Sequence, residues 1–121
     1  RDYLYRNLGN GRFEEVLEKA MPEISKGSMG ADMADVNNDG WPDVFVTEMT
    51  PPDPARYQTK SAFDSWNSYT LALEAGYHRQ FGRNMLHLNN GDGTFSEVAR
   101  QGGVWATDWS WGALAADFDN D

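Results

Sequence analysis

The sequence repeats itself at a fixed distance, and this repetition restricts the fold more than any other feature of the chain. The segment GALAADFDND at 112–121 follows the segment GADMADVNND at 30–39 by 82 positions. The motif L-x-x-N-x-G-x-G-x-F-x-E-V begins at Leu4 and, again 82 positions later, at Leu86. The chain therefore holds about one and a half repeats of an 82-residue unit.

Each unit opens with a predicted β-hairpin. The turn of the first hairpin is LGNG at 8–11, and that of the second is NGDG at 90–93. Asn-Gly and Asp-Gly pairs between strand-like runs favour tight hairpin turns. Two further strands are predicted in the first unit, at about 28–35 and at 43–47. Four short strands per repeat are typical of a β-propeller blade.

These patterns predict an all-β fold with a helical insertion, built from β-propeller-type four-stranded blades. Residues 1–47 are the first predicted blade, and residues 83–121 are a second, incomplete one. Residues 48–82 form an insertion that the blade pattern does not need. It begins with the prolines of 51–54, which end the preceding strand because they lack a backbone donor.

The loop between the third and fourth strands of the first unit has the spacing of a calcium site. Residues 35–43 read D-x-N-x-D-G-x-x-D, and the glycine lets the backbone turn sharply. Asp, Asn and Gly also favour ordinary turns, but this preference explains their presence and not their spacing. Ca²⁺ takes about six to eight oxygen ligands. The predicted ligands are Asp35, Asn37, Asp39, the backbone carbonyl of Trp41, and Asp43.

The second unit contains the beginning of the same loop. Asp117, Asp119 and Asp121 occupy the places of Asp35, Asn37 and Asp39. We therefore predict them as the first three ligands of a second calcium site. Three ligands by themselves would bind the ion weakly, because Ca²⁺ needs a fuller oxygen shell.

Together these motifs resemble the FG-GAP/VCBS repeat family. The resemblance rests on the two hairpin motifs, the S-x-G-A-x-x-A-D segments that start at Ser28 and Ser110, and the loop at 35–43. The segment 110–121 is similar to VCBS blades of secreted proteins with an ASPIC/UnbV type of domain. The resemblance implies a calcium-binding β-propeller on an extracellular or cell-surface protein, used for adhesion or assembly. It places the family's metal ligands on the same five residues of the first loop.

The partners follow from the repeat and from the charge. Propellers need roughly four to eight blades, so we expect this chain to be a piece of a longer repeat protein or to rely on other copies of itself. The formal net charge of -9 disfavours nucleic acid, which requires clustered Lys and Arg. The sequence has no apolar run near 18 residues, so no membrane span is predicted.

The insertion is predicted to contain one helix over about 56–75, ended by Gly76. Apolar and aromatic side chains recur along it at spacings of three and four. One interpretation is that this stripe packs against the blades, and the other is that it forms a platform for a sugar or a partner chain. The residues of the stripe are Phe63, Trp66, Tyr69, Leu73 and Tyr77.

The sequence favours a binding or structural module over an enzyme. It has no cysteine and no nucleophile motif, and its only imidazoles are His78 and His87. We therefore predict a calcium-stabilised extracellular module for adhesion or assembly, with self-association as one form of that assembly. The alternative is a carbohydrate-binding module that contacts a surface polysaccharide, because Trp105 and Trp109 lie close together in the sequence and an indole stacks well on flat ligands.

Overall fold

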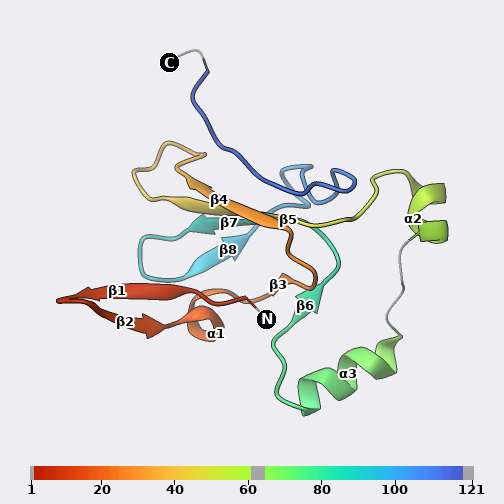
Figure 1. The fold of residues 1–121 in the computed structure, drawn as a ribbon, viewed down its shortest axis with the longest axis horizontal. Helices are drawn as coiled ribbons and strands as arrows, with labels where there is room; N and C mark the ends of the chain where they lie inside the picture. Colours follow the sequence, from red (N-terminus) through yellow and green to blue (C-terminus); the bar gives the residue numbers. More distant parts are fainter. Residues whose placement is uncertain (1, 61–64, 119–121) are drawn as a thin grey trace.

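The structure is a computed structural model that describes residues 2–60 and 65–118 (Figure 1). The chain is mostly β with some helix and forms several small sheets, which confirms the coarse fold prediction. The elements in chain order are β1 (Tyr5–Gly9), β2 (Arg12–Glu15), α1 (Leu17–Ala20), β3 (Ile24–Ser25), β4 (Gly30–Ala34), β5 (Asp43–Thr47), α2 (Pro54–Lys60), α3 (Trp66–Glu74), β6 (Gln80–Phe81), β7 (Met85–Asn89) and β8 (Phe95–Glu97).

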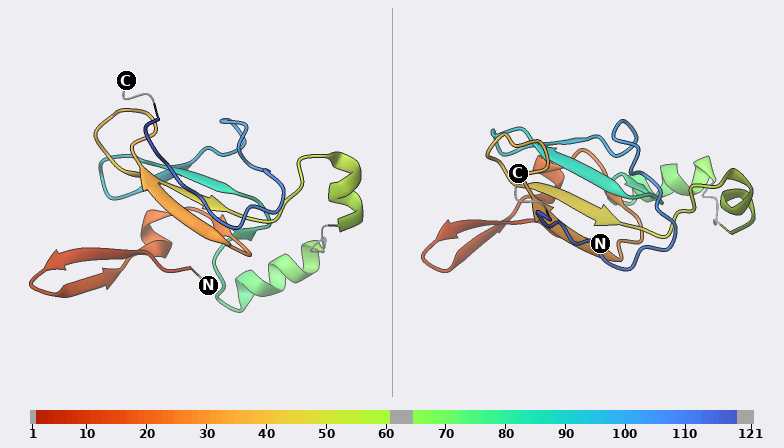
Figure 2. Two further views of the ribbon diagram at one scale, coloured as in Figure 1. Left: turned by 45° about the horizontal axis from the view of Figure 1, so that its top comes forward. Right: turned by 90° about the horizontal axis from the view of Figure 1, so that it is seen from above.

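The main sheet has four strands in the order β4-β5-β7-β8, with every neighbouring pair antiparallel. The hairpin β1–β2 forms a separate two-stranded sheet, and β3 pairs with β6 in parallel. Figure 2 shows the hairpin in a layer apart from the four-stranded sheet. The β-structure therefore consists of one four-stranded sheet with a smaller layer below it.

The four-stranded sheet combines strands from both sequence units, which differs from the expected one sheet per unit. β4 and β5 come from the first unit, and β7 and β8 are the opening hairpin of the second. The physical reason lies in residues 17–25. They form α1 and β3, whose apolar side chains pack below β5. This segment leads the chain from the hairpin layer to the sheet, so the first hairpin does not pair with β4.

The two hairpins have the same geometry, so the sequence repeat is also a structural repeat. Tyr5 pairs with Glu15 in the first hairpin as His87 pairs with Glu97 in the second, 82 positions on. The turn is closed in both by an Asn side chain. The Gly9 amide donates to Asn7 Oδ1 at 2.8 Å, and the Gly91 amide donates to Asn89 Oδ1 at 3.0 Å.

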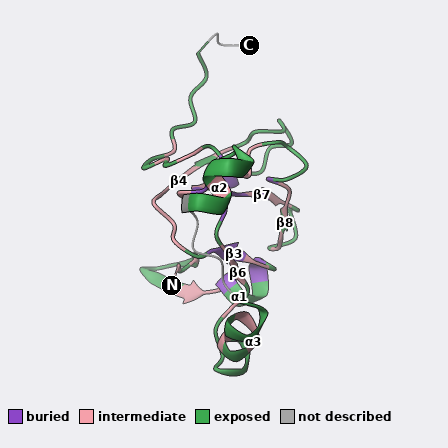
Figure 3. Ribbon diagram, turned by 90° about the vertical axis from the view of Figure 1, so that its right-hand side faces the viewer, coloured by how far each residue is buried: buried purple, intermediate pink, exposed green. Residues whose placement is uncertain are grey.

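The apolar core lies between the hairpin layer and the four-stranded sheet. Leu17, Met21 and Ile24 pack against Val44 of β5, and all four are buried. Burial of aliphatic side chains is the main force that holds the two layers together, at roughly 1.5–3 kcal/mol for each one fully buried. Figure 3 shows buried residues gathered around α1 and β3, whereas α2 and α3 are mostly exposed.

A buried cation stabilises the start of β7. The side chain of Arg83 is 8% exposed and forms ion pairs with Glu23 and Glu97. Burial raises the pKa of Glu97, but the hydrogen bonds from Arg83 and from the Ala99 and Leu86 amides outweigh it, so the pKa of Glu97 is lowered overall. The carboxylate is thereby kept ionised opposite Arg83.

Residues 112–116, which are the sequence equivalent of β4 in the second unit, lie next to β4 itself. A Cβ atom on Gly30 would be 2.8 Å from Gly112 Cα, so a side chain at Gly30 would collide with the backbone there. The Ala115 amide donates to Asp32 Oδ2 at 2.6 Å. This bond and the one from the Met33 amide lower the pKa of Asp32. Equivalent segments of successive units are thus neighbours in space.

The described residues of the insertion form two helices where the sequence pattern predicted one over 56–75. Ser65 has an extended backbone (φ −69°, ψ 151°), and its hydroxyl accepts the Ser68 amide, so it begins a new helix as an N-cap. No residue of α3 is buried. Within the aromatic stripe, the Tyr69 ring lies 5.6 Å from Trp66 and 5.7 Å from Phe81 of β6. Phe63 lies outside the described residues.

His87 is the one described histidine in the sheet, and its environment disfavours a charge. It is 1% exposed, and its Nδ1 atom has no hydrogen-bond partner. Burial lowers the pKa of His87 to about 4, and Glu97 and Arg83 act on it in opposite directions. The imidazole is therefore neutral at pH 7. Its sequence counterpart in the first hairpin is Tyr5, which agrees with a structural place for His87 on the sheet.

The burial of His87 predicts how the free energy of unfolding depends on pH. Because the pKa of His87 is about 4 in the folded chain and 6.5 in an ordinary, solvent-exposed histidine, the unfolded chain binds more protons between these limits. The free energy of unfolding should therefore fall as the pH is lowered from about 6.5 to about 4, by up to about 3 kcal/mol. Urea unfolding at pH 7, 6 and 5 measures the slope. His87→Leu should flatten this slope. A variant that keeps the wild-type slope would show that His87 is not its cause.

Candidate functional site

The loop at 35–43 joins β4 to β5 at one end of the four-stranded sheet. The two strands are held together up to the loop, since Ala34 pairs with Asp43. Two residues in the loop have left-handed backbone angles, Asn38 with φ 59° and Gly40 with φ 89°. Gly adopts this conformation without steric cost, and Asn tolerates it better than most residues. These two positions let nine residues reverse the chain direction tightly.

Three of the predicted ligands direct their side-chain oxygens into the loop. The Asp39 amide lies 3.0 Å from Asp35 Oδ1 and 3.1 Å from Asn37 Oδ1, so these two oxygens converge on one N–H. Asp35 Oδ2 accepts the Gly40 amide at 2.8 Å, and Asp39 Oδ1 accepts the Trp41 amide at 2.8 Å. The loop backbone thus gathers the oxygens of these three side chains.

The Asn37 side chain bonds to Asp39 through both its nitrogen and its oxygen. Its Nδ2 atom donates to Asp39 Oδ2 at 2.8 Å while its Oδ1 faces the Asp39 amide. An amide at this position contributes an oxygen without a third negative charge. It therefore adds no further charge repulsion to that between Asp35 and Asp39, which like charges a few Å apart feel.

Asp43 has a different surrounding from the other predicted ligands. It is 1% exposed, and its two oxygens accept amides from two different parts of the chain. Asp43 Oδ2 accepts the Val36 amide at 3.0 Å, which closes the loop, and Oδ1 accepts the Asn89 amide of β7 at 2.8 Å. A carboxylate has about four lone-pair sites, so both oxygens keep capacity for a further ligand. Asp43 therefore ties the loop of the first unit to the hairpin of the second.

The donor set fits a hard cation through carboxylate and amide oxygens together. Within residues 2–60 and 65–118, no group of three or more His, Cys, Asp or Glu side chains is arranged to hold a metal ion. A calcium site in this loop therefore requires Asn37 and the backbone carbonyl of Trp41 in addition to the aspartates. In the second loop, Asp117 is exposed, and Asp119 and Asp121 lie outside the described residues.

The Trp41 side chain connects the loop to the second hairpin. A Cβ atom on Gly91, in the β7–β8 turn, would be 3.0 Å from Trp41 Nε1 and 3.2 Å from Cε2. The indole therefore lies directly against the backbone of Gly91 and remains 51% exposed. The indole contact with Gly91 and the hydrogen bond from Asn89 to Asp43 therefore attach the loop to the second hairpin at two points.

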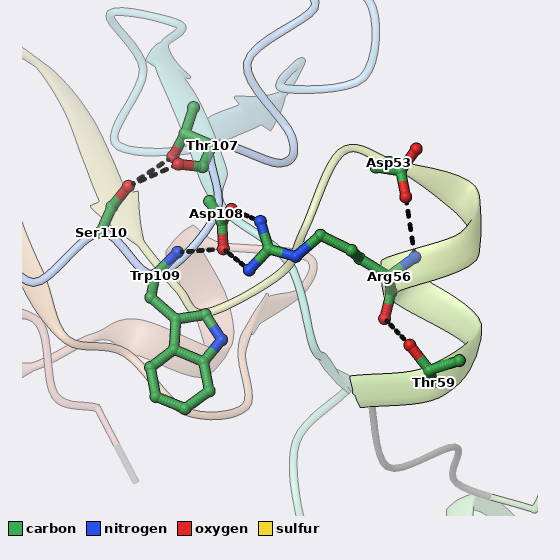
Figure 4. Close-up of polar contacts among 7 residues, drawn as sticks. All are labelled: Asp53, Arg56, Thr59, Thr107, Asp108, Trp109 and Ser110. Carbon is green, nitrogen blue, oxygen red and sulfur yellow. Dashed lines mark hydrogen bonds and ion pairs between the residues drawn. The ribbon is translucent and has the colours of Figure 1, made fainter.

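The structure does not give Trp105 and Trp109 similar surroundings. The Arg100 guanidinium lies 5.0 Å from the centre of the Trp105 ring, so one face of this half-buried indole is covered. Trp109 is 56% exposed. Figure 4 shows Trp109 beside an ion pair between Arg56 of α2 and Asp108, in which the second contact, Arg56 Nη2 to Asp108 Oδ1, is 3.2 Å.

The pair of Arg56 and Asp108 was not predicted from the sequence. Asp108 has a left-handed backbone (φ 65°), and its amide donates to the Thr50 carbonyl at 3.0 Å, next to the start of the insertion. The two partners are 52 positions apart, and neither belongs to a motif. An Asp among the tryptophans of residues 105–111 is the one local signal in the sequence, and it does not identify the partner.

A family model matches most of the sequence, including both hairpins and the loop at 35–43. The model of the FG-GAP-like repeat matches residues 1–46 and 66–121. The chain belongs to the FG-GAP-like repeat family. Searches of curated proteins and of solved structures gave no match. The family match omits residues 47–65, which contain α2 and the first part of the predicted insertion.

Family membership indicates a repeat module of the kind used in interaction or adhesion. FG-GAP-like repeats typically occur in extracellular or surface proteins. None of the helices in the described part of the chain is long and apolar enough to cross a membrane.

The contact between Trp41 and Gly91 can be tested with two glycines of one turn. Gly91 (φ 75°) and Gly93 (φ 89°) both have left-handed angles, but a Cβ atom on Gly93 would have no neighbour within 4 Å. Each Gly→Ala change should cost about 1–2 kcal/mol for the backbone conformation. Gly91→Ala should cost roughly 1 kcal/mol more, because it displaces the Trp41 indole. Denaturant unfolding gives both values, and equal losses would argue against the contact.

Proposed function

We propose that this FG-GAP-like repeat is a calcium-stabilised module of an extracellular or cell-surface protein that serves adhesion or assembly. The observation that supports it most is the convergence of side-chain oxygens from Asp35, Asn37 and Asp39 inside the loop. The alternating D-x-N-x-D spacing, which resembles FG-GAP/VCBS repeats, supplies the same oxygen set, and residues 110–121 resemble the VCBS blades of secreted ASPIC/UnbV-type proteins.

In such a module the residues of the loop at 35–43 would be the ligands of the ion. Asp35, Asn37, Asp39, the Trp41 carbonyl and Asp43 would hold the ion, and bound Ca²⁺ would supply positive charge among aspartates in a chain of net charge -9. Because Asp43 also accepts the Asn89 amide, order in the loop is transmitted to β7. A ligand that binds only the folded chain stabilises it in proportion to its affinity.

A propeller-type blade is the second part of the proposal. Four antiparallel strands in chain order are the build of such a blade. Here the candidate blade is β4-β5-β7-β8, so it is shared between two successive units. The shared blade supports a protein in which each unit needs its neighbour, as in other repeat proteins.

Removal of the ion and of one ligand tests the proposal. Calcium at about 100 times its Kd should stabilise the wild type by about 2.7 kcal/mol relative to a chelator. Asp39→Ala should remove most of this gain and sharply lower the affinity measured by calorimetry. Asp92→Ala is the control, since Asp92 also accepts a local amide, from Thr94 at 2.9 Å, but lies in a hairpin turn outside the loop.

Magnesium provides a second comparison in the same experiment. It prefers octahedral geometry at about 2.0–2.1 Å and loses water reluctantly, so it should replace calcium poorly. Wild-type melting that is identical in calcium and in chelator would refute the structural role of the ion. Equal affinities for the two metals would refute the predicted calcium site.

A carbohydrate-binding module is the second candidate function. The observation that favours it is an exposed Trp109 indole beside the ion pair of Arg56 and Asp108. A flat aromatic ring next to charged hydrogen-bonding groups suits a sugar ring, which has apolar faces and polar edges. The candidate surface contains Trp109 and excludes the covered face of Trp105.

Fluorescence titration with oligosaccharides tests this second function. If Trp109 stacks on a sugar, emission should change in a saturable way, and Trp109→Ala should abolish the change. Trp66→Ala serves as the control, because Trp66 is 76% exposed on α3 and lies outside this surface. No saturable change with a panel of neutral and acidic oligosaccharides would reject the carbohydrate function.

A further inference from the structure

The turn of the first hairpin contains an asparagine followed directly by a glycine. Asn10 and Gly11 lie between Gly9 and Arg12, which pair across the hairpin. Both turn residues have left-handed backbone angles, with φ 52° for Asn10 and φ 71° for Gly11, as a type I′ turn requires. Figure 1 shows this turn at the free end of the β1–β2 hairpin. Both residues are exposed, so solvent water reaches them.

An Asn-Gly pair has an intrinsic reactivity that the surrounding structure either permits or prevents. The amide nitrogen of the glycine can attack Cγ of the asparagine side chain, and glycine hinders this attack least because it has no side chain. A side chain or an amide that is held by a hydrogen bond must first be released by local opening. The hydrogen bonds at an Asn-Gly pair therefore influence how fast it reacts in the folded chain.

The pair at 10–11 has both of its reacting groups free. Within residues 2–60 and 65–118, the Asn10 side chain has no hydrogen-bond partner and the Gly11 amide has no acceptor. A Cβ atom on Gly11 would meet nothing within 4 Å among the same residues. The nitrogen and the side-chain carbon can thus approach each other without breaking a contact.

The other Asn-Gly pair, at 90–91, is also exposed but is held at both reacting groups. Asn90 Nδ2 donates to Thr94 Oγ1 at 3.0 Å, and Asn90 Oδ1 accepts the Ser96 hydroxyl at 2.9 Å. The Gly91 amide, which would be the attacking group, donates to Asn89 Oδ1 at 3.0 Å. Three hydrogen bonds therefore have to open before this pair can react.

The repeat shows that a loop packed against the hairpin leaves this position open. By the 82-residue equivalence, Asn10 and Gly11 correspond to Asp92 and Gly93. The loop at 35–43 packs against the second turn, yet Asp92 is exposed there. A Cβ atom on Gly93 would have no neighbour within 4 Å in the described part of the chain. The accessibility of the first turn is therefore a property of the hairpin itself.

One sequence difference between the units explains why Asn10 is not held. In the second hairpin, Asp92 Oδ1 accepts the Thr94 hydroxyl at 2.6 Å. The equivalent of Thr94 in the first hairpin is Arg12, which has no hydroxyl. Asn10 therefore lacks the partner that fixes its counterpart.

We propose that Asn10 is a site of spontaneous deamidation and isomerisation in the folded protein, and that Asn90 is protected from the same reaction. The Gly11 nitrogen forms a bond to Asn10 Cγ, the bond from Cγ to Nδ2 breaks, and Nδ2 leaves as ammonia with the proton of the Gly11 amide. The product is a cyclic succinimide. Solvent water then opens one of its two bonds to the Gly11 nitrogen. Opening at Cγ gives aspartate, and opening at the backbone carbonyl carbon gives isoaspartate.

The two products change the hairpin differently. Aspartate gives the first turn the Asp-Gly pair that the second hairpin has at 92–93. Isoaspartate leads the main chain through Cβ and Cγ, so the backbone gains one carbon atom and loses the geometry of the two-residue turn. Each product adds one negative charge beside Arg12. The reaction needs no ion in the loop at 35–43, so this inference is independent of the proposed calcium function.

Mass spectrometry of the aged protein tests the proposal. The chain is incubated folded or unfolded in urea, in mildly alkaline buffer that helps to remove the amide proton, and is then cleaved with trypsin. Cleavage after arginine separates residues 7–12 from residues 84–100. Deamidation raises the mass of a peptide by one unit, fragmentation locates the changed residue, and chromatography separates isoaspartate from aspartate.

The two Asn-Gly pairs of one chain serve as each other's control. In the folded protein, Asn10 should convert at least about tenfold faster than Asn90, because three hydrogen bonds hold the second pair. In urea the two rates should agree within about twofold, because unfolding removes these bonds. The difference between the two conditions therefore measures the effect of the structure.

Two variants test the contacts directly. Thr94→Val removes the acceptor of Asn90 Nδ2 and should speed conversion of Asn90 in the folded chain by about threefold or more. Arg12→Thr introduces the hydroxyl of the second hairpin and should slow conversion of Asn10 by a similar factor. Circular dichroism of each variant checks that the fold is kept.

Two outcomes would overturn the proposal. The first is equal conversion of Asn10 and Asn90 in the folded chain, which would show that the hydrogen bonds do not distinguish them. The second is an Asn10 that stays intact in the folded chain while it converts in urea, which would show that the turn geometry protects it.

Discussion

The carboxylate of Asp43 is the contact on which the arrangement of this FG-GAP-like repeat depends. One oxygen accepts the Val36 amide and closes the loop, and the other accepts the Asn89 amide and fixes the end of β7, next to the turn of the second hairpin. Hydrogen bonds from backbone amides to a buried carboxylate are stronger than neutral ones, and loss of the acceptor would leave the amides unpaired. A single side chain thus links a loop, the central pair of strands and two sequence units.

Much of the local structure could be predicted from the sequence, because it depends on residues close together in the chain. The Asn-Gly and Asp-Gly turns, the strand at 43–47 and the 82-residue repeat are all confirmed in the structure. The pairing of strands was not predictable in the same way. Equivalent hairpins can pair within a unit or across units, and the apolar pattern of β7 is compatible with both. The position of α1 and β3 below β5 decides between them.

The candidate sites show the same division. Asp35, Asn37 and Asp39 bond to amides no more than five positions away, and their spacing describes the loop well. Asp43 belongs to the same motif, but its second partner is 46 positions away, and the motif does not show that bond. Trp105 and Trp109 are neighbours in sequence, yet Arg100 covers the first and the second is exposed. Long-range contacts decide these roles, and the sequence spacing does not encode them.

A sheet shared between units changes how stability is distributed along a repeat protein. If each unit formed a complete sheet, its strands would be stable without neighbours, and successive units would interact only through side chains. Here β5 has its second edge satisfied by the next unit, and backbone hydrogen bonds connect the two units directly. Pairing between neighbours makes folding cooperative along the array, because loss of one hairpin exposes the edge of the unit before it. The buried Arg83 at the entry to β7, held by Glu23 of the first unit and Glu97 of the second, strengthens the same connection.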